Sequence, residues 1–279
     1  MKSNRGELLG EFIGCFMLIL IGAGSVASML VNGAQYTMWD ICMVWGVAIT
    51  MALYMTASLS GAHLNPAVTL AMAVYRGFPW GKVAPYAIAQ MAGTFCAAGV
   101  VYALYRQGFL QYEAAHGIVR GSEESQQLAS VFSTYPAPYL SFLQAGLVEL
   151  VITAFLVAVI FCLVDERNPF APPKALFPIA VGGLVAVIGG AFGSLTGFAM
   201  NPARDFGPKL FTALVGWGPV ALPGWSGYFW VPLLAPLLGG IIGGGLYDWF
   251  VGKYRTAENT GADGSERLET APSSKAMES

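Results

Sequence analysis

The tripeptide Asn-Pro-Ala occurs twice in this chain, and its residue types suit hydrogen bonding to an uncharged ligand. The two copies are Asn65, Pro66, Ala67 and Asn201, Pro202, Ala203. Asparagine is a good N-cap, and proline suits the first position of a helix because the amide hydrogen that it lacks would have no partner there. Each copy therefore predicts a helix start. Its positive dipole end, with the asparagine amide, can donate to an oxygen atom and repel a cation.

Two glutamates, Glu11 and Glu149, stand inside apolar runs at an offset of 138 residues. A carboxylate in a membrane segment is costly and suggests a function. Either these acids relay protons, or each accepts backbone N–H bonds from a non-helical loop beside it and braces that loop. Their symmetric positions favour loop bracing, because a proton relay rarely needs the same acid in both halves.

The remaining residue types predict no catalytic residues, no metal site and no cofactor. The chain has only two histidines, and it contains neither a Ser/His/Asp set nor a glycine-rich phosphate loop. Its four cysteines fall in apolar runs, where we interpret them as small buried hydrophobic residues. The net charge of −2 gives no support for nucleic-acid binding. The sequence therefore argues against an enzyme and against a nucleic-acid partner.

The composition predicts that transmembrane helices position these residues. Apolar residues make up 56% of the chain and charged residues 11%, against about 25% charged in a typical soluble domain. The apolar residues form runs of the length that a transmembrane helix needs, about 20 residues. More spans follow the first, so we interpret it as an uncleaved helix and not as a signal peptide. The predicted spans are 8–30, 41–60, 83–106, 142–164, 176–194 and 229–250.

The spans form one predicted transmembrane domain, residues 1–250, followed by a polar, disordered tail at 251–279. The domain divides into halves at 7–106 and 142–250, which a polar loop at 107–141 connects. Each half has three spans and one apolar segment too short to span, 61–76 or 197–213, and each short segment contains a tripeptide. Because three is an odd number, the second half enters the membrane upside down, as an inverted repeat with its site at the midplane.

The short segments predict a pore. Backbone that is not helical is tolerated at membrane depth only where it is buried in protein or lines a wet cavity. Two half-helices, at about 66–76 and 202–213, would meet at the centre with their positive ends together. An ordinary helix start explains one tripeptide, but two copies at equivalent repeat positions favour a pore over a purely structural role.

The lysines and arginines predict that both termini are cytoplasmic, because cytoplasmic loops carry an excess of these residues. In that orientation the outer side keeps Arg106, Arg120 and Lys209, and Arg204 lies in the pore segment. The cytoplasmic side collects Lys2, Arg5, Arg76, Lys82, Arg167, Lys174, Lys253 and Arg255.

With both tripeptides, both glutamates and the six-span layout, the chain resembles the major intrinsic protein (aquaporin) superfamily. The segments 60–69 and 196–208 resemble its glycerol-facilitator branch, and so do Asp205 and the positions Tyr135, Lys209, Pro232 and Leu233. The resemblance implies an all-α membrane protein with six transmembrane helices and two re-entrant half-helices. It also implies a homotetramer in the lipid bilayer of the inner (plasma) membrane, with one pore per subunit, that passively conducts glycerol, small polyols and water.

By the same resemblance, the selectivity filter consists of Trp45, Gly189, Phe198 and Arg204. The two aromatic rings would offer an apolar corner to the carbons of a polyol, and the guanidinium would donate to its hydroxyls and repel cations. Trp45 and Phe198 could also be ordinary packing residues, whereas a buried arginine needs a stronger reason. Water-selective members usually carry a histidine at the position of Gly189 and a smaller residue at Phe198.

The resemblance further implies that backbone carbonyls line both halves of the pore. The carbonyls expected on the inner side are those of Gly61, Ala62, His63 and Leu64, and on the outer side those of Gly197, Phe198 and Ala199. The ring of His63 is an alternative candidate for a gate. Asp205 and Lys209 are four residues apart on a half-helix, a spacing that permits a structural salt bridge.

Two other functions remain open from the sequence. The chain could be an aquaporin that conducts mainly water, or an ion-coupled transporter for small solutes, since such transporters also use inverted repeats and broken helices. A coupled transporter would need a titrating acid or a cation site in its pathway. The bracing role expected for the glutamates and the arginine in the pore both argue against that mechanism.

Overall fold

The computed structural model describes residues 4–224 and 227–255, and in these ranges the regular structure is entirely helical. The tail predicted over 256–279 lies outside the described residues. Six helices are long and apolar enough to cross a membrane, which confirms the six-span prediction. These helices are α1 (Asn4–Asn32), α2 (Met38–Ser60), α4 (Val83–His116), α6 (Phe142–Val164), α7 (Phe177–Thr196) and α10 (Trp230–Phe250).

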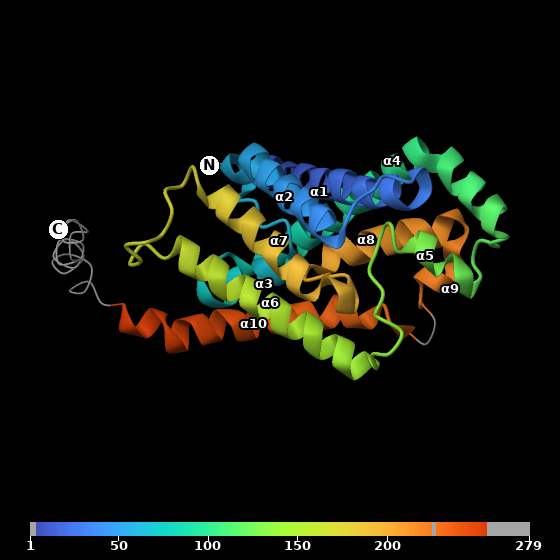
Figure 1. Ribbon diagram of the computed structural model, residues 1–279. Helices are drawn as coiled ribbons and strands as arrows, with labels where there is room; N and C mark the ends of the chain where they lie inside the picture. The colour runs from blue at the N-terminus through green and yellow to red at the C-terminus, as the bar shows by residue number, and fades with distance from the viewer. Residues whose placement is uncertain (1–3, 225–226, 256–279) are drawn as a thin grey trace, which may run out of the picture.

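Two shorter helices carry the tripeptides, and six short elements among the described residues complete the connections. The half-helices are α3 (Pro66–Tyr75) and α8 (Pro202–Thr212). The remaining elements are η1 (Trp80–Lys82), η2 (Glu123–Ser125), α5 (Gln126–Ala129), η3 (Ala213–Trp217), α9 (Gly218–Ala221) and η5 (Gly252–Tyr254). Figure 1 shows the long helices running along one direction, with both ends of the described chain at the same end of the bundle.

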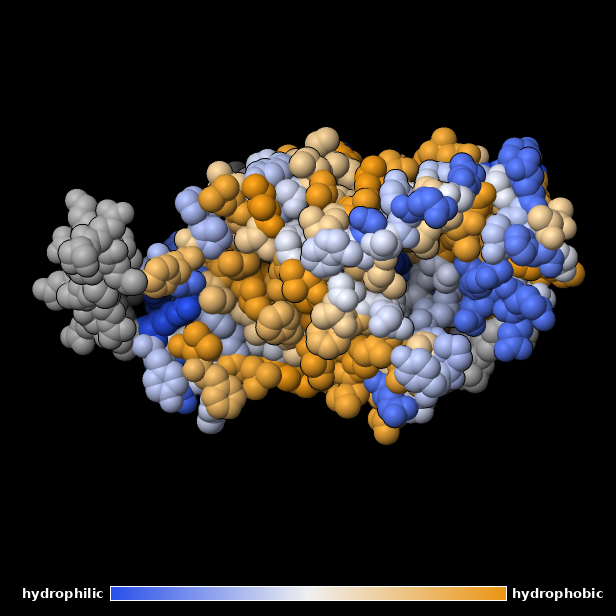
Figure 2. Space-filling view, viewed as in Figure 1, coloured by the Kyte–Doolittle hydropathy of each residue, from blue (hydrophilic) through white to orange (hydrophobic). Residues whose placement is uncertain are grey.

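The contacts between helices follow the predicted repeat. Helix α1 packs against α4 as α6 packs against α10, and each half-helix crosses to the other half, with α8 against α4 and α3 against α10. Glycines allow these approaches: a Cβ atom on Gly243 would lie 2.1 Å from the Ala154 carbonyl oxygen. On the outside, apolar side chains cover most of the flank visible in Figure 2, and polar side chains gather at its two ends, as a bilayer requires.

Helix α4 is longer than the sequence predicts. The apolar run ends near residue 106, but the helix continues to His116 and ends where Gly117 adopts a φ of +64°. The extra turns are held by packing: Phe109 is fully buried and stacks on Phe132 at 5.5 Å between ring centroids. The connection predicted as a polar loop over 107–141 is therefore partly helical, and it also contains η2 and α5.

Candidate conduction pore

The two tripeptides begin α3 and α8 with the cap that their residue types predict. Asn65 has extended backbone, and its side-chain oxygen accepts from the Ala67 amide at 2.8 Å. Asn201 is also extended, and its oxygen accepts from the amides of Ala203 at 3.0 Å and Arg204 at 3.2 Å. The proline occupies the first helical turn in both. Each asparagine is thus fixed with its NH₂ group left to donate.

Each asparagine amide reaches across to the other half of the repeat. Nδ2 of Asn65 donates to the Met200 carbonyl at 2.8 Å, and Nδ2 of Asn201 donates to the Leu64 carbonyl at 2.7 Å. Sequence reasoning missed this exchange, because nothing in a local pattern places one loop beside the other. An amide nitrogen carries two hydrogens. One hydrogen of each amide therefore joins the two halves and the second is left for a ligand.

The loops before both tripeptides have an unusual backbone. Ala62, Leu64, Phe198 and Met200 have φ between +41° and +51°, a region that is costly for residues with a Cβ atom. Such a conformation persists only where the surroundings hold it. The residues from Gly61 to Leu64 line the inner cavity described below.

The two glutamates hold these loops. Glu11 accepts from the amides of His63 at 2.9 Å and Leu64 at 2.7 Å, and Glu149 accepts from those of Ala199 at 2.9 Å and Met200 at 2.8 Å. Both carboxylates are fully buried. Each takes a third bond from a side chain that sequence reasoning had not singled out: these donors are Gln90, at 2.7 Å, and Thr196, at 2.6 Å.

His63 is held within the inner side of the loop. Its Nδ1 lies 3.2 Å from the Thr69 hydroxyl, and its ring meets Phe78 and Tyr86 at centroid distances of 4.7 and 5.4 Å. Thr69 also takes part in the brace, because it accepts from Gln90 at 3.1 Å. The histidine therefore belongs to the packing that supports the loop.

A cavity of about 230 Å³, which we call the inner cavity, lies on the side of the asparagines toward the end of α6 and the start of α7. One wall consists of the residues from Gly61 to Asn65, and Val68 and Met72 of α3 continue it. The opposite wall is aliphatic and aromatic: Leu18, Ile49, Leu53, Leu156, Ile160, Val164, Phe177, Val181 and Val185. A path with the backbone of a non-helical loop on one wall and apolar side chains on the other suits a molecule that is itself polar on one side.

The narrow part lies on the other side of the asparagines. A cavity of only about 50 Å³ is lined there by Trp45, Phe198 and Arg204 together with Asn65 and Asn201. The two aromatic rings meet edge to face, at 6.2 Å between centroids and 78° between planes. The Arg204 guanidinium lies 4.2 Å from the centroid of the Trp45 ring and donates to the Phe132 carbonyl at 3.0 Å. The same three side chains also line a wider outer cavity of about 360 Å³.

Gly189, the fourth predicted filter residue, lies behind the Phe198 ring. A Cβ atom there would be 2.8 Å from Sγ of Cys42 and 3.1 Å from the ring. Gly193, one turn further along α7, supports the same ring from the other end, and a Cβ atom on it would lie 2.9 Å from Cδ1 of Phe198. The two glycines thus make room for the ring, a role of Gly193 that the sequence pattern did not reveal.

The salt bridge that the spacing of Asp205 and Lys209 permits is present and buried. Asp205 also accepts from the backbone amide of Thr134 at 2.6 Å and from its hydroxyl at 2.7 Å, and Lys209 donates to the Thr134 carbonyl at 3.0 Å. These bonds fix the loop around Thr134. Phe132, whose carbonyl accepts the hydrogen bond from Arg204, belongs to the same loop. The Lys209 ammonium lies 5.1 Å from the ring centroid of Tyr135. This contact gives a structural role to Tyr135, one of the positions that resemble the glycerol-facilitator branch.

The chain is similar to known proteins over most of its length. The chain is 53% identical to the glycerol uptake facilitator protein of Pseudomonas aeruginosa, over 89% of this chain and 90% of that protein. It is 49% identical to the glycerol uptake facilitator protein of Escherichia coli (strain K12), over 90% of this chain and 89% of that protein. It is 51% identical to the propanediol uptake facilitator PduF of Salmonella typhimurium, over 90% of this chain and 96% of that protein.

Among solved structures, the aquaglyceroporin of Plasmodium falciparum superposes with a TM-score of 0.78 at 32% sequence identity, covering 88% of this chain and 96% of that one. The family model described as "Major intrinsic protein" matches residues 1–247. The chain is therefore a member of the major intrinsic protein family, a multi-pass membrane protein of channel type.

Proposed function

We propose that this protein is a passive channel that conducts glycerol, related small uncharged polyols and some water, and excludes ions and protons. The observation that carries the proposal is the filter cavity, where two aromatic rings meet edge to face beside a buried guanidinium. A polyol presents carbons on one side and hydroxyls on the other, so it matches this combination. The names of the relatives, glycerol and propanediol uptake facilitators, support the same solute class.

The solute would lose most of its water at the filter. The Trp45 and Phe198 rings contact its carbons, and Arg204 donates to its hydroxyls with the N–H groups that Phe132 does not use. The positive charge repels cations there. No bond is made or broken, and the driving force is the solute gradient alone.

At the centre, the free hydrogens of Asn65 and Asn201 would donate to each solute oxygen in turn. A water molecule that accepts from both amides cannot at the same time accept a proton from a neighbouring water, so a proton-conducting chain is interrupted. The positive ends of α3 and α8 meet at this place and disfavour cations. Beyond it, the carbonyls of residues 61–63 would accept from the hydroxyls along the inner cavity. The Leu64 carbonyl, expected from the sequence to join them, is already used by Asn201 and Cys15.

Location and assembly are part of the proposal. We place the protein in the plasma membrane with both termini in the cytoplasm, because the lysines and arginines gather on the side of the termini. A homotetramer with one pore per subunit is the assembly that the family resemblance implies.

The experiment is reswelling of liposomes that contain the purified protein, measured by stopped-flow light scattering across water, glycerol, propanediol, urea and longer polyols. We expect glycerol and propanediol to enter much faster than in empty liposomes. An Arg204→Ala variant, in the same lipid, is expected to lose the preference among solutes. Rapid water flow with no acceleration of any polyol would contradict the proposal and favour a water channel.

A further inference from the structure

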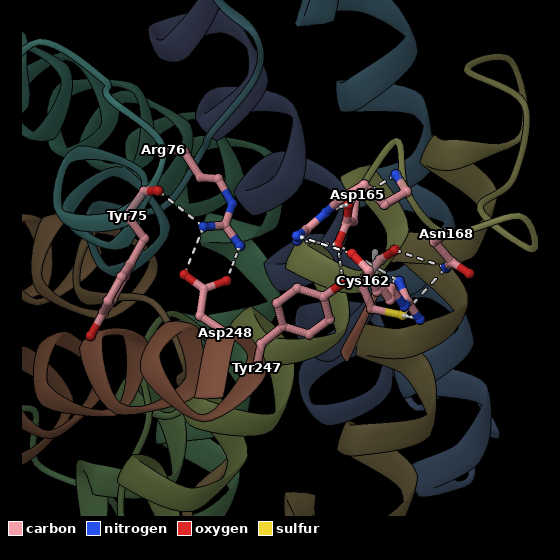
Figure 3. A network of polar contacts seen from close by, with 9 residues as sticks. Tyr75, Arg76, Cys162, Asp165, Asn168, Tyr247 and Asp248 are labelled. Atoms are coloured by element: carbon pink, nitrogen blue, oxygen red, sulfur yellow. Dashed lines mark hydrogen bonds and ion pairs between the residues drawn. The ribbon is translucent and has the colours of Figure 1, made fainter. Parts of the chain in front are cut away.

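Arg76 lies at the far end of half-helix α3 from the pore asparagine. It is the C-cap residue of α3, and Nη1 of its guanidinium donates to the Tyr75 carbonyl at 3.0 Å. The same guanidinium makes a bidentate (two-pronged) salt bridge with Asp248 of α10, at 2.9 Å for Nη1–Oδ2 and 2.6 Å for Nη2–Oδ1 (Figure 3). A cation is favourable at a helix C-terminus, and a two-pronged pair fixes orientation as well as distance.

A third helix contacts the guanidinium. Its central carbon lies 3.9 Å from the centroid of the Phe161 ring on α6, and Phe161 is fully buried. One side chain therefore joins the end of α3 to both α6 and α10. We call the group of Arg76, Asp248 and Phe161 the α3 latch.

The α6 and α10 parts of the latch are themselves tied together. Tyr247, next to Asp248, donates from its hydroxyl to Oδ2 of Asp165 at 2.6 Å (Figure 3), and Asp165 is the C-cap residue of α6. Arg255 donates to the Tyr247 hydroxyl at 2.9 Å, and Arg167 donates to Asp165 through Nε at 2.9 Å and Nη2 at 3.0 Å. The latch thus rests on a connected frame.

The position of α3 matters because its two faces have different neighbours. Val68 and Met72 line the inner cavity. On the face toward α10, the carbonyl of Ala67 would be 2.8 Å from a Cβ atom on Gly240, and the Tyr75 hydroxyl donates to the Ile241 carbonyl at 3.0 Å. A helix of 10 residues is too short to be stable in isolation, so contacts with its neighbours determine where it lies.

The second half of the repeat has no charge at the matching place. The offset of 136 residues between the tripeptides pairs Arg76 with Thr212, whose hydroxyl donates to the Pro208 and Lys209 carbonyls of its own helix, both at 3.1 Å. Helix α8 continues directly into η3, whereas α3 ends at Arg76. The latch is therefore a feature of the inner half and not of the repeat itself.

We infer that Arg76 is a positioning residue for conduction: the α3 latch fixes α3 so that Val68 and Met72 stay at the wall of the inner cavity. This inference rests on the proposed function. Without the latch, α3 can turn or slide, and the long Met72 side chain enters a cavity of about 230 Å³, which slows the solute there. The filter would be unchanged, because none of its side chains belongs to α3. The movement would be greatest at the Arg76 end, because Asn65 ties the other end of α3 to the Met200 carbonyl.

The test compares glycerol permeability per channel in liposomes for the wild type, Arg76→Gln, Asp248→Asn and the charge exchange Arg76→Asp with Asp248→Arg. Either single variant is expected to lower permeability about threefold to tenfold, the range of a partly buried ion pair with a cation–π contact. The exchange should restore at least half of the loss. Lys253→Gln is the control, since it removes an exposed cation at the same end of the bundle that contacts the Trp249 and Tyr254 rings and not α3, and it should stay near wild type.

A second measurement reports the position of α3 directly. With Met72→Cys in each background, the rate of modification by a water-soluble thiol reagent is read from the mass of the peptide, so that native cysteines do not interfere. We expect Arg76→Gln to change this rate and the charge exchange to return it. Arg76→Lys, which keeps the charge but not the two-pronged pair, should give an intermediate value if the glutamine variant does not fold.

The two proposals fail differently. If the wild type does not accelerate glycerol entry, the proposed function is wrong. If the wild type conducts and the folded single variants conduct equally well with unchanged Met72→Cys labelling, the latch inference alone is wrong.

Discussion

The ring of Phe198 rests on the backbone of Gly193, so closely that a Cβ atom on the glycine would lie 2.9 Å from Cδ1 of the ring. Contacts of this length do not occur, so one of the two must move. The ring has Gly189 and Cys42 behind it, and the free direction is toward the filter cavity of about 50 Å³.

Gly193→Ala is therefore expected to narrow the filter. Overpacking of this kind costs about 1–3 kcal/mol of folding stability. We expect the displaced ring to lower glycerol permeability about tenfold, which corresponds to a barrier higher by about 1.4 kcal/mol. Water is smaller and should be slowed less. The measurement is the glycerol-to-water permeability ratio in liposomes, with Gly183→Ala on the same helix as control, because a Cβ atom at Gly183 meets nothing within 4 Å. A ratio that does not fall in the first variant would contradict the packing argument.

The double change Phe198→Ala with Gly189→His should move selectivity toward water. A histidine at position 189 has no room while the Phe198 ring is present, since even a Cβ atom would lie 3.1 Å from it. Removing the ring makes space into which the imidazole can turn, with the Cys42 thiol rotating away from the new Cβ atom. The imidazole then replaces an apolar corner with a polar one. We expect the glycerol-to-water ratio to fall in the double variant, and Gly189→His alone to express or fold poorly. An unchanged ratio in a well-folded double variant would show that the filter is elsewhere.

Glu149→Gln and Glu11→Gln should destabilise the protein without revealing a proton pathway. A glutamine side chain turns one acceptor into a donor, so a buried backbone N–H loses its partner, at a cost of about 1–3 kcal/mol. We expect a lower unfolding temperature in detergent for both, and no change for Glu166→Gln, which removes an exposed carboxylate. If either variant kept its stability but lost a pH-dependent flux, the acids would be proton relays after all.

The pH dependence of stability should show the role of Asp165, which lies just beyond the end of α6. Hydrogen bonds from Arg167 hold the pKa of this carboxyl well below its usual value, and burial opposes them only partly. A lowered pKa in the folded protein gives stability that is complete above the ordinary pKa of about 3.9 and is lost as the pH falls below it.

The unfolding temperatures of the wild type and Asp165→Asn should accordingly differ by a constant amount between pH 5 and pH 8. Below about pH 4 the difference should narrow, because the unfolded wild type takes up the proton there while the folded protein, with its lowered pKa, does not. Glu166→Gln, one residue further on, provides the comparison for a carboxylate without these bonds. A difference that shrinks between pH 8 and pH 5 would contradict the lowered pKa.

Much of this architecture could be predicted from the sequence, because local signals and the membrane agree. Long apolar runs predicted the six spans, and the repeated Asn-Pro pair predicted that α3 and α8 start at Pro66 and Pro202. The acids at 11 and 149 were expected to brace loops, and their hydrogen bonds run to backbone amides of the loops beside them.

Other features depend on contacts between distant residues, which no local pattern contains. The extension of α4 depends on Phe109 against Phe132, and the orientation of Arg204 depends on the Phe132 carbonyl. The left-handed backbone at Ala62 and Leu64 runs against the intrinsic preference of both residues, so it is explained only by the tertiary hydrogen bonds that hold it.

The central claim, a passive pore for an uncharged solute, is tested most directly by measuring glycerol flux and membrane current on the same preparation. Liposomes with the purified protein should take up glycerol rapidly with no sodium gradient, no pH gradient and no membrane potential. The same protein in a planar bilayer should carry no current of protons or sodium above the lipid background. Glycerol uptake that stops when the ion gradients are removed, or a current that accompanies it, would contradict the account.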